Sequence, residues 1–530
     1  MILASLVVLV MMVGAVSATS DWLMFNRDLK NTGVADSALT GISTPTEIWS
    51  YTTDNLIGSG SPVIGDIDND GELDILIPTA NFGSTAGIYA AGIYALDKEG
   101  NLKWKYQTGD YGTYATPPMA DIDGDGKLET IFPSYAGKIV AVDDDGTEIW
   151  SVDKGSAGTR SVIADVTGDN GLDVVVGAAS KTFLLKASDG TQIWQADYRM
   201  LCDPAIADVD GDGKLEIVFS ASGKVIVALN AENGTVAWTS TAMGQDAQNN
   251  LAIITDINSD GKPDVVAGAR DKKFYVFSGA DGTQIWSYTV VGRTFSAAAA
   301  DFNGDGYDDV VTTATRANGI ESYVYLLDVK NQVLLWQHNI VGKKYYSTER
   351  SPSIADINGD GTPDIVVAGL SKKLYALSGT DGSEIWTIDT NDPSAGVPAI
   401  GDLNGDGIMD IVVSAGNSVQ VFSETVIEAS INIDPDTLNL ASKGVFTAFI
   451  QLPEGYDVVV IDISTVKCEG ASAVRGIVDG DTFIAKFNRE DLRDLPIGDE
   501  VEMTVTGKLS DGTPFEGRDT IRVIDKGKGK

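Results

Sequence analysis

A nine-residue acidic stretch that occurs eight times constrains the fold of this chain of 530 residues more than any other feature. One copy, DIDGDGKLE, runs from Asp121 to Glu129, with carboxylates at positions one, three, five and nine and glycine at position six. Further copies start at Asp66, Asp165, Asp208, Asp256, Asp301, Asp356 and Asp402. Carboxylates this close together call for a cation, and Ca²⁺ takes six to eight oxygen ligands at about 2.3–2.6 Å. The repetition predicts an array of calcium loops.

Eight tryptophans recur with the same period, 44 to 55 residues apart, and each precedes an acidic loop by 14 to 20 residues. They are Trp49, Trp104, Trp150, Trp194, Trp238, Trp286, Trp336 and Trp386. Each repeat contains short apolar segments with period-two alternation and glycine-rich turns, which are typical of four β-strands. Four antiparallel strands in about 40–50 residues are typical of a β-propeller blade.

The two ends of the array predict how the ring closes. The segment TEIWSY has no blade before it, and the last repeat has an acidic loop but no tryptophan. We therefore expect the first strand to complete the eighth blade, which removes free sheet edges. The fold class predicted is all-β, with an eight-bladed β-propeller over residues 45–425.

Three further segments flank the propeller. An apolar run ending in a small-residue site predicts a signal peptide over residues 1–18, with an uncleaved anchor as the alternative. Residues 19–44 form a lead-in, in which Trp22 and Phe25 are expected to pack against the ring. Long alternating segments predict a C-terminal β-sandwich over residues 426–525, and residues 526–530 are expected to be a disordered tail.

The formal net charge of −38 makes nucleic acid an unlikely partner class. Eight bound Ca²⁺ would add +16 and leave −22 (−38 + 16). No second apolar segment has spanning length, so no membrane span is expected in the mature chain. The two cysteines, Cys202 and Cys468, are far apart in sequence and are expected to be buried thiols rather than a disulfide.

The repeats resemble known families. The loops D-x-[DN]-x-D-G-x-x-[DE] resemble the FG-GAP/VCBS calcium repeats of integrin α-subunit propellers, and the turns DGTQIW and DGSEIW resemble the tryptophan-docking motif of pyrroloquinoline-quinone (PQQ) dehydrogenase propellers. Together these resemblances cover about residues 45–425 and imply up to eight structural Ca²⁺. The segment DWLMFNRDLKNTG resembles the lead-in that often precedes such propellers. Because a PQQ dehydrogenase is expected to carry an adjacent cysteine pair and Cys202 stands alone, no PQQ is expected.

The C-terminal segments IDPDTLNL, LPEGYDV and DGTPFEGRDTIRV resemble an immunoglobulin-like module of archaeal and bacterial surface proteins. This resemblance implies an immunoglobulin-like sandwich over residues 426–525.

Positions one, three, five and nine of the loops are the predicted metal ligands. They are Asp66, Asp68, Asp70, Asp74, Asp121, Asp123, Asp125, Glu129, Asp165, Thr167, Asp169, Asp173, Asp208, Asp210, Asp212, Glu216, Asp256, Asn258, Asp260, Asp264, Asp301, Asn303, Asp305, Asp309, Asp356, Asn358, Asp360, Asp364, Asp402, Asn404, Asp406 and Asp410. The last four loops have Asn at position three, which removes a charge and should weaken binding. The third loop has Thr167 and Asn170 at positions three and six, so it is the site expected to be empty. The alternative is an ordinary Asp/Gly turn without metal.

Strand order predicts two faces on the disk. The acidic loops share one face with the turns before the tryptophans, and we call it the loop face. The connectors after the tryptophans and the turns before each third strand form the other, the connector face. A ligand-binding set is predicted there: Tyr114, Arg160, Tyr198, Arg199, Arg293, Phe295, Tyr345, Tyr346 and Arg350. Arg and Tyr favour a glycan or protein ligand, although basic turn residues can also serve solubility alone.

No catalytic constellation is evident, since the single histidine, His338, follows Trp336 on an outer strand and no nucleophile elbow or phosphate loop occurs. We therefore expect no enzyme but an exported, calcium-stabilised propeller at the cell surface or secreted, which binds or adheres to an extracellular glycan or protein. The alternatives are a polysaccharide-active, lyase-like enzyme with an Arg, Lys or Tyr base, and a purely structural envelope component.

Overall fold

The structure is a computed structural model. It describes residues 22–24, 27–35, 39, 41–57, 60–80, 91–155, 158–178, 180–244, 252–257, 262–316, 321–341, 351–369, 372–392, 396–424, 426–492, 495–510 and 512–525. The predicted signal peptide and tail lie outside these residues. The chain forms two compact units: Glu47–Phe422 with the lead-in up to Ile42, and Ser423 onward with Ser43–Thr46.

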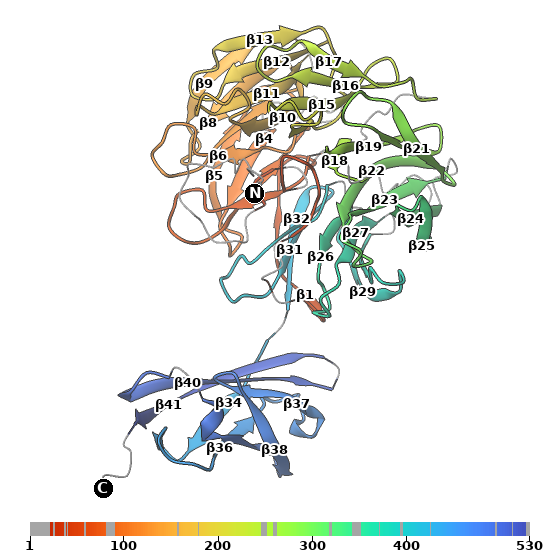
Figure 1. Cartoon of the computed structure of the whole chain (residues 1–530). Coiled ribbons are helices and arrows are strands. Elements are labelled where there is room, and N and C mark those ends of the chain that lie inside the picture. Colours follow the sequence, from red (N-terminus) through yellow and green to blue (C-terminus); the bar gives the residue numbers. More distant parts are fainter. Residues whose placement is uncertain are drawn as a thin grey trace, which may run out of the picture. The chain divides into compact units, whose positions relative to one another are not determined.

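The described strands of the first unit form eight four-stranded sheets, the blades of a propeller (Figure 1). The first four blades are β2 (Val63–Gly65), β3 (Asp74–Pro78), β4 (Gly92–Leu96), β5 (Leu102–Gln107); β6 (Met119–Ala120), β7 (Glu129–Pro133), β8 (Lys138–Val142), β9 (Glu148–Asp153); β10 (Gly158–Ala164), β11 (Asp173–Ala178), β12 (Lys181–Lys186), β13 (Gln192–Ala196); and β14 (Ala205–Ala207), β15 (Glu216–Ala221), β16 (Val225–Asn230), β17 (Val236–Thr239). The next four are β18 (Ala252–Thr255), β19 (Asp264–Ala269), β20 (Lys273–Phe277), β21 (Gln284–Thr289); β22 (Arg293–Ala300), β23 (Asp309–Thr315), β24 (Glu321–Asp328), β25 (Val333–Val341); β26 (Ser353–Ala355), β27 (Asp364–Gly369), β28 (Lys373–Leu377), β29 (Glu384–Asp389); and β30 (Ala399–Gly401), β31 (Asp410–Ala415), β32 (Ser418–Glu424) with β1 (Pro45–Thr52).

The first strand closes the ring as the sequence predicts. β1 lies beside β32 and completes the eighth blade, although residues 53–417 separate them in the chain. The indole Nε1 of Trp49 on β1 then donates to the carbonyl of Lys98 in the first blade at 2.7 Å. The prediction of eight blades with a shared last blade is confirmed.

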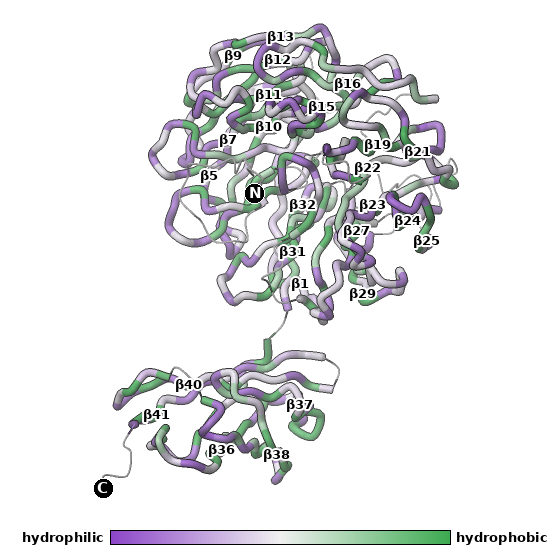
Figure 2. The backbone as a smooth tube through the Cα atoms, in the orientation of Figure 1, coloured by the Kyte–Doolittle hydropathy of each residue, from purple (hydrophilic) through white to green (hydrophobic). Residues whose placement is uncertain are grey.

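Burial follows the order of strands within each blade. The second strands are buried along their whole length, as in DILIP of β3 and DVVVGA of β11, because both faces of each blade pack on neighbouring blades. The fourth strands are half exposed, as in LKWKYQ of β5. In Figure 2 the tube is hydrophobic over much of β31 and turns hydrophilic in the loops.

The lead-in pairs with the first strands of six blades, and this path could not be read from the sequence. Trp22 and Ile64 exchange two backbone hydrogen bonds of 2.9 and 3.0 Å, and the Trp22 side chain is fully buried. Further carbonyls of the lead-in accept amides of the next blades: Leu23 from Met119, Leu29 from Ile206, Lys30 from Ile254, Thr32 from Ala299 and Gly33 from Ile354. The expected packing of Trp22 is thus present, whereas Phe25 lies outside the described residues.

Six of the repeated tryptophans contact a glycine in the turn of the next blade, whereas the indole of Trp386 donates to the carbonyl of Ile42 in the lead-in. The indole of Trp150 donates to the carbonyl of Ala187 at 2.8 Å, and its ring lies against Gly190 of the turn before the next tryptophan. Gly190 has φ +69°, and a Cβ there would lie 2.7 Å from Trp150 Cε3. The turn requires glycine both for its left-handed backbone and for the flat contact with the indole.

The second unit is an all-β module with one continuous nine-stranded sheet. Its described elements are β33 (Ile427–Glu428), β34 (Ser430–Asp434), β35 (Thr437–Asn439), β36 (Val445–Gln451), β37 (Ile461–Cys468), β38 (Ala471–Asp479), β39 (Thr482–Asn488), β40 (Gly498–Leu509), β41 (Pro514–Ile524) and the 3₁₀ turns Val458–Val460 and Arg489–Asp491. β34 pairs with β36, whereas β33 and β35 on either side of it pair with β41. The chain thereby brings the two ends of the sheet together into a nearly closed, barrel-like arrangement.

This module differs from the predicted sandwich of two separate sheets. The long strand β38 pairs with both β37 and β39, so it joins the halves that a sandwich would keep apart. Alternating burial, as in VFTAFIQ of β36, still encloses one apolar core, as the period-two pattern predicts. Cys468 in this core and Cys202 in the propeller are both buried thiols that form no disulfide, as expected.

Candidate functional site

The acidic loops connect the first and second strands of the blades. In the second blade, Asp121 directly follows β6, and Glu129 is the first residue of β7. Glu129 is fully buried because it belongs to a second strand, whereas Asp123 and Asp125 are exposed on the turn. This loop therefore carries one carboxylate under the turn and two exposed carboxylates on it.

Backbone amides hold the turn through hydrogen bonds to the carboxylate at position one. Asp121 Oδ1 accepts the amide of Gly124 at 2.6 Å and its Oδ2 accepts that of Gly126 at 3.1 Å. In the eighth loop Asp402 accepts the amides of Gly405 and Gly407, both at 2.8 Å. The carboxylate at position one thus holds a turn that uses left-handed residues at positions four and six.

Three loops bring three carboxylates together. Within the described chain, single oxygens of the acids in each group lie within 4.8 Å of one another. The groups are Asp66, Asp68 and Asp70; Asp121, Asp123 and Glu129; and Asp208, Asp210 and Glu216. All three loops have Asp at position three. An all-oxygen donor set of this kind suits a hard cation such as Ca²⁺.

Two buried glutamates supply the strongest indication of a cation. Glu129 Oε2 accepts the Ile122 amide at 2.7 Å, and Glu216 Oε2 accepts the Val209 amide at 3.1 Å. The other oxygen of each carboxylate, Oε1, is buried without a hydrogen-bond partner. A buried charged oxygen without a partner is costly, and a cation among the gathered acids would satisfy it.

Burial raises the pKa of six carboxyl groups at position nine, among them two glutamates. The pKa of Glu129 rises from 4.5 to about 8 and that of Glu216 from 4.5 to about 7, chiefly because burial disfavours the ionised form. Burial also raises the pKa of Asp309 to about 7 and that of Asp364 to about 6. These groups therefore keep their proton to a higher pH than ordinary carboxyl groups do, unless a positive charge lies beside them.

The other loops show how the substitutions at position three act. Asn303 Oδ1 accepts the Asp305 amide at 2.9 Å, and its Nδ2 donates to Asp309 Oδ1 at 3.2 Å, so the amide replaces one charge with hydrogen bonds. In the third loop Thr167 Oγ1 donates to Asp173 Oδ2 at 3.0 Å.

Asn170 at position six of the third loop takes φ +68°, as its tolerance of left-handed angles allows. In the fifth loop Asn258 and Asp260 lie outside the described residues. The predicted ligand roles and the emptiness of the third site stay predictions.

A lysine that the sequence reasoning missed lies at the first loop. Lys103 Nζ is 2.7 Å from Asp68 Oδ2 and 2.7 Å from Asp74 Oδ2. The pKa of Asp74 is nevertheless raised to about 6, because burial outweighs the effect of Lys103. One feature of the sequence could have indicated this contact: Lys103 precedes Trp104, whereas the other repeats have an apolar residue before the tryptophan.

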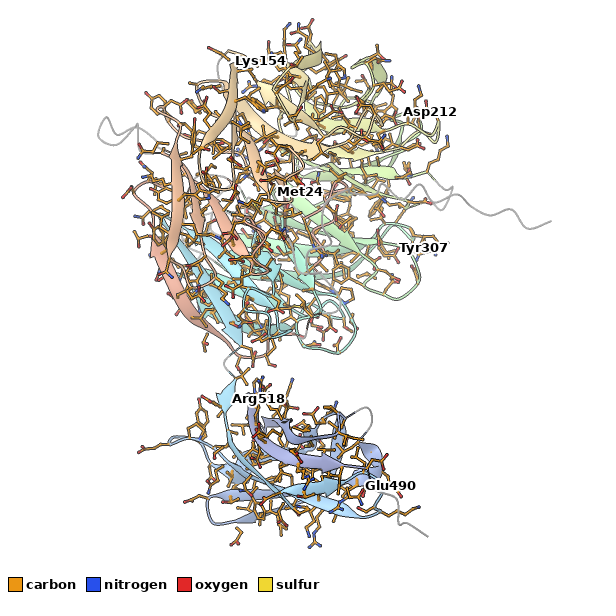
Figure 3. The ribbon with its side chains drawn as sticks, turned by 90° about the vertical axis from the view of Figure 1, so that its left-hand side faces the viewer. Met24, Lys154, Asp212, Tyr307, Glu490 and Arg518 are labelled. Atoms are coloured by element: carbon orange, nitrogen blue, oxygen red, sulfur yellow. The ribbon has the colours of Figure 1, made fainter. Side chains whose placement is uncertain are left out.

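Contacts within the blades support the two faces. Lysines and acids link acidic loops to the turns before the tryptophans, as in the pairs Lys127–Asp144 at 2.8 Å and Lys214–Glu232 at 2.7 Å. On the other side, the Lys154 amide of a connector donates to the carbonyl of Gly137 in a turn before a third strand. Figure 3 shows Asp212 and Tyr307, from the fourth and sixth loops, along the same side of the propeller.

The predicted ligand set on the connector face is only partly exposed. Arg199 and Arg293 are exposed, and Tyr114 and Tyr198 are half-buried. The side chain of Phe295, and all of Tyr345, Tyr346 and Arg350, lie outside what the structure describes.

Arg160 is buried, in contrast to the exposed role that was expected. Its Nε lies 3.2 Å from Asp203 Oδ2, and its Nη1 donates to the Tyr114 carbonyl at 3.0 Å. This ion pair joins the third blade to the connector before the fourth blade. A ligand could reach the guanidinium of Arg160 only if the ion pair with Asp203 broke.

An aromatic cluster gathers on the same face around a residue that the sequence reasoning did not include. The Tyr135 ring lies 5.6 Å from that of Tyr111 and 5.3 Å from that of Tyr114, both in edge-to-face geometry. Tyr111 and Tyr135 are 40% and 45% exposed. Tyr135 lies in the turn before a third strand, and only the topology brings it to Tyr111 and Tyr114.

Comparisons with known proteins agree with the propeller. Residues 135–344 match the family described as outer membrane protein assembly factor BamB, a PQQ-type repeat family, and residues 356–413 match the FG-GAP-like repeat. The second match spans the seventh and eighth acidic loops. The chain is therefore similar to PQQ-like propellers and to FG-GAP-like repeats in different parts of one ring.

Solved structures show the same fold at low sequence identity. Quinohemoprotein alcohol dehydrogenase from Comamonas testosteroni matches with a TM-score of 0.57 and 13% identity over 77% of this chain and 81% of its own. A europium-containing methanol dehydrogenase matches with 0.57 and 14% over 77% and 98%. The V. cholerae biofilm matrix protein Bap1 matches with 0.53 and 14% over 72% and 91%. These likenesses establish the propeller and leave catalysis open. Among the described residues, no helix is long and apolar enough to cross a membrane.

Proposed function

We propose that this protein is an exported, calcium-stabilised propeller that binds a glycan through its connector face. The observation that carries the calcium role is the pair of buried glutamates, Glu129 and Glu216, each with one oxygen without a partner beside two further acids. The ligands come from single contiguous loops, so calcium acts by holding the corner of a blade. A catalytic metal would need an open coordination position and a nearby acid or base.

The glycan role rests on the aromatic cluster of the exposed Tyr111 and Tyr135 with the half-buried Tyr114. Tyrosine offers a large apolar face with a polar hydroxyl at low entropic cost, which suits contact with a sugar ring. The exposed Arg199 and Arg293 on the same face can donate to sugar hydroxyls or carboxylates. The similarity to a biofilm matrix protein is one of fold and is consistent with an extracellular role.

The raised pKa of Tyr114 favours binding over a lyase reaction in which this residue is the base. A tyrosine base at neutral pH requires a lowered pKa. Burial instead raises the pKa of Tyr114 to about 12. The hydroxyl therefore stays protonated and serves as a hydrogen-bond donor.

A glycan array probed with the full chain, with and without calcium, tests the proposal. The double variant Tyr111→Ala/Tyr135→Ala should lose binding, whereas Tyr456→Ala, an equally exposed tyrosine of the second unit, should keep it. Analysis of any bound glycan for shortened or unsaturated products separates binding from cleavage. Turnover, or binding that survives the double variant, would contradict the proposal.

A further inference from the structure

The first acidic loop differs from the others in what lies over it. Lys103 precedes Trp104 on β5, the fourth strand of the first blade. At the same position the other repeats have an apolar residue: Ile48, Ile149, Ile193, Ala237, Ile285, Leu335 and Ile385. A basic residue at this one place is therefore a departure from the repeat.

A β-bulge determines where this side chain points. On β4 and β5, Ala95 is paired with Trp104 and Leu96 with Leu102, so Lys103 is the extra residue between two pairs. Bulges re-aim the side chain of the extra residue.

The same bulge occurs in the second blade. There Ala141 is paired with Trp150 and Val142 with Glu148, and Ile149 is the extra residue, 38% exposed. The bulge is thus common to both blades, and the identity of the residue on it is the difference between them.

The ammonium of Lys103 contacts two of the four predicted metal ligands of its own blade. Its Nζ lies 2.7 Å from both Asp68 Oδ2 and Asp74 Oδ2, at positions three and nine. Asp74 is almost fully buried, with 3% of its side chain exposed. Charge-assisted contacts this short are strong. They place the ammonium of Lys103 where a metal ion would contact Asp68 and Asp74.

The grouping of acids agrees with this assignment. In the second and fourth loops the acid at position nine, Glu129 or Glu216, joins the group of three and keeps one oxygen without a partner. In the first loop the group contains Asp66, Asp68 and Asp70 and omits Asp74, the acid at position nine. One oxygen of Asp68 remains buried and without a partner, so the loop retains a residual, weaker site for a cation.

We propose that Lys103 supplies the cation of the first acidic loop. The loop then holds its shape without calcium, and its affinity for calcium is about tenfold or more below that of the second loop, since affinity follows the net ligand charge. This inference rests on the proposed calcium role of the other loops. The first blade lies beside the closing blade, and on this proposal its acidic loop keeps its conformation when calcium is removed.

Exchange of residues between the two bulges tests the proposal on the full chain. Lys103→Ile restores the residue of the other repeats, and Ile149→Lys places an ammonium over the second loop. Calcium bound per chain is counted at subsaturating and saturating Ca²⁺. We expect Lys103→Ile to gain one tight site and Ile149→Lys to lose one.

Thermal unfolding in calcium-free buffer is the second measurement. Lys103→Ile leaves Asp68 and Asp74 without the ammonium that contacts them and should lower the melting temperature, whereas Ile149→Lys should raise it. Lys103→Ile that changes neither the calcium count nor the calcium-free melting temperature would overturn the proposal. A wild-type chain that binds no calcium would refute the proposed calcium role, and the calcium-free melting temperatures would still decide the role of Lys103.

Discussion

Removal of calcium should make the stability of the propeller fall as the pH rises. The folded pKa of Glu129, about 8, and that of Glu216, about 7, both lie above the ordinary value of 4.5. Stability from a raised carboxyl pKa is fully present below pH 4.5 and is lost as the pH rises through 7 and 8. Calcium favours the ionised carboxylates and should remove this loss, so the effect is specific to the metal-free chain.

The magnitude follows from the two shifts. At about 1.4 kcal/mol per pH unit, Glu129 and Glu216 set upper limits of about 5 and 3 kcal/mol. Halving these for solvent screening leaves about 4 kcal/mol. Because Glu129 is only half ionised at pH 8, about 3 kcal/mol of this is lost between pH 5 and pH 8. An unfolding entropy of about 2.1 cal/mol/K per residue, over roughly 380 residues, converts that loss to a melting temperature about 4 °C lower at pH 8 than at pH 5.

Tryptophan fluorescence measures this change in the propeller alone, because all nine tryptophans precede residue 423. Melting curves are recorded from pH 5 to pH 8 in buffer passed over a chelating resin, and again with added calcium. The variant Glu129→Gln/Glu216→Gln imitates the protonated acids and should show a flatter pH dependence without calcium. A metal-free melting temperature that stays constant or rises toward pH 8 would refute the reasoning.

Two further predictions concern contacts between blades. Gly190→Ala should destabilise the propeller by about 2–3 kcal/mol, because it adds a clash with an indole to the strain of a positive φ; Gly223→Ala, with φ +104° and open space around it, measures the strain alone. Arg160→Leu should cost about 3–5 kcal/mol because it leaves Asp203 buried without its ion pair. The double variant Arg160→Leu/Asp203→Leu should recover most of this loss in chemical denaturation. Equal losses for Gly190→Ala and Gly223→Ala, or no recovery in the double variant, would contradict these accounts.

Features with a local, repeated signal could be predicted from the sequence. Each repeat carries its own turn, its own tryptophan and its own apolar strands, so the number of blades and the closure by β1 followed from counting. The turn DGTQIW is likewise a short local motif, and in the structure its Gly190 lies against Trp150. Period and turn chemistry are properties of neighbouring residues, and these are what a sequence displays.

Features that depend on distant pairing could not be predicted. The exposure of Arg160 was overestimated because its partner, Asp203, lies in the next connector and no local pattern links the two. The sandwich was predicted from alternating strands, but alternation is equally compatible with a single curved sheet, and the pairing of β38 with both neighbours decides between them. The contact of Lys103 with the first loop depends on a β-bulge, and the position of a bulge cannot be recognised from the amino-acid composition of the strand.

The path of the lead-in bears on where a ligand can bind. Its backbone uses hydrogen bonds to the first strands of six blades, so those inner edges already have a partner within the chain. Trp22 adds a large side chain that is completely buried at the inner side of the first blade. A ligand at the axis would have to displace these contacts, whereas Tyr111 and Tyr135 stand exposed on the connector face. Binding at the connector face, as proposed, would require no rearrangement of the ring, and it would leave the acidic loops on the opposite face to act on stability alone.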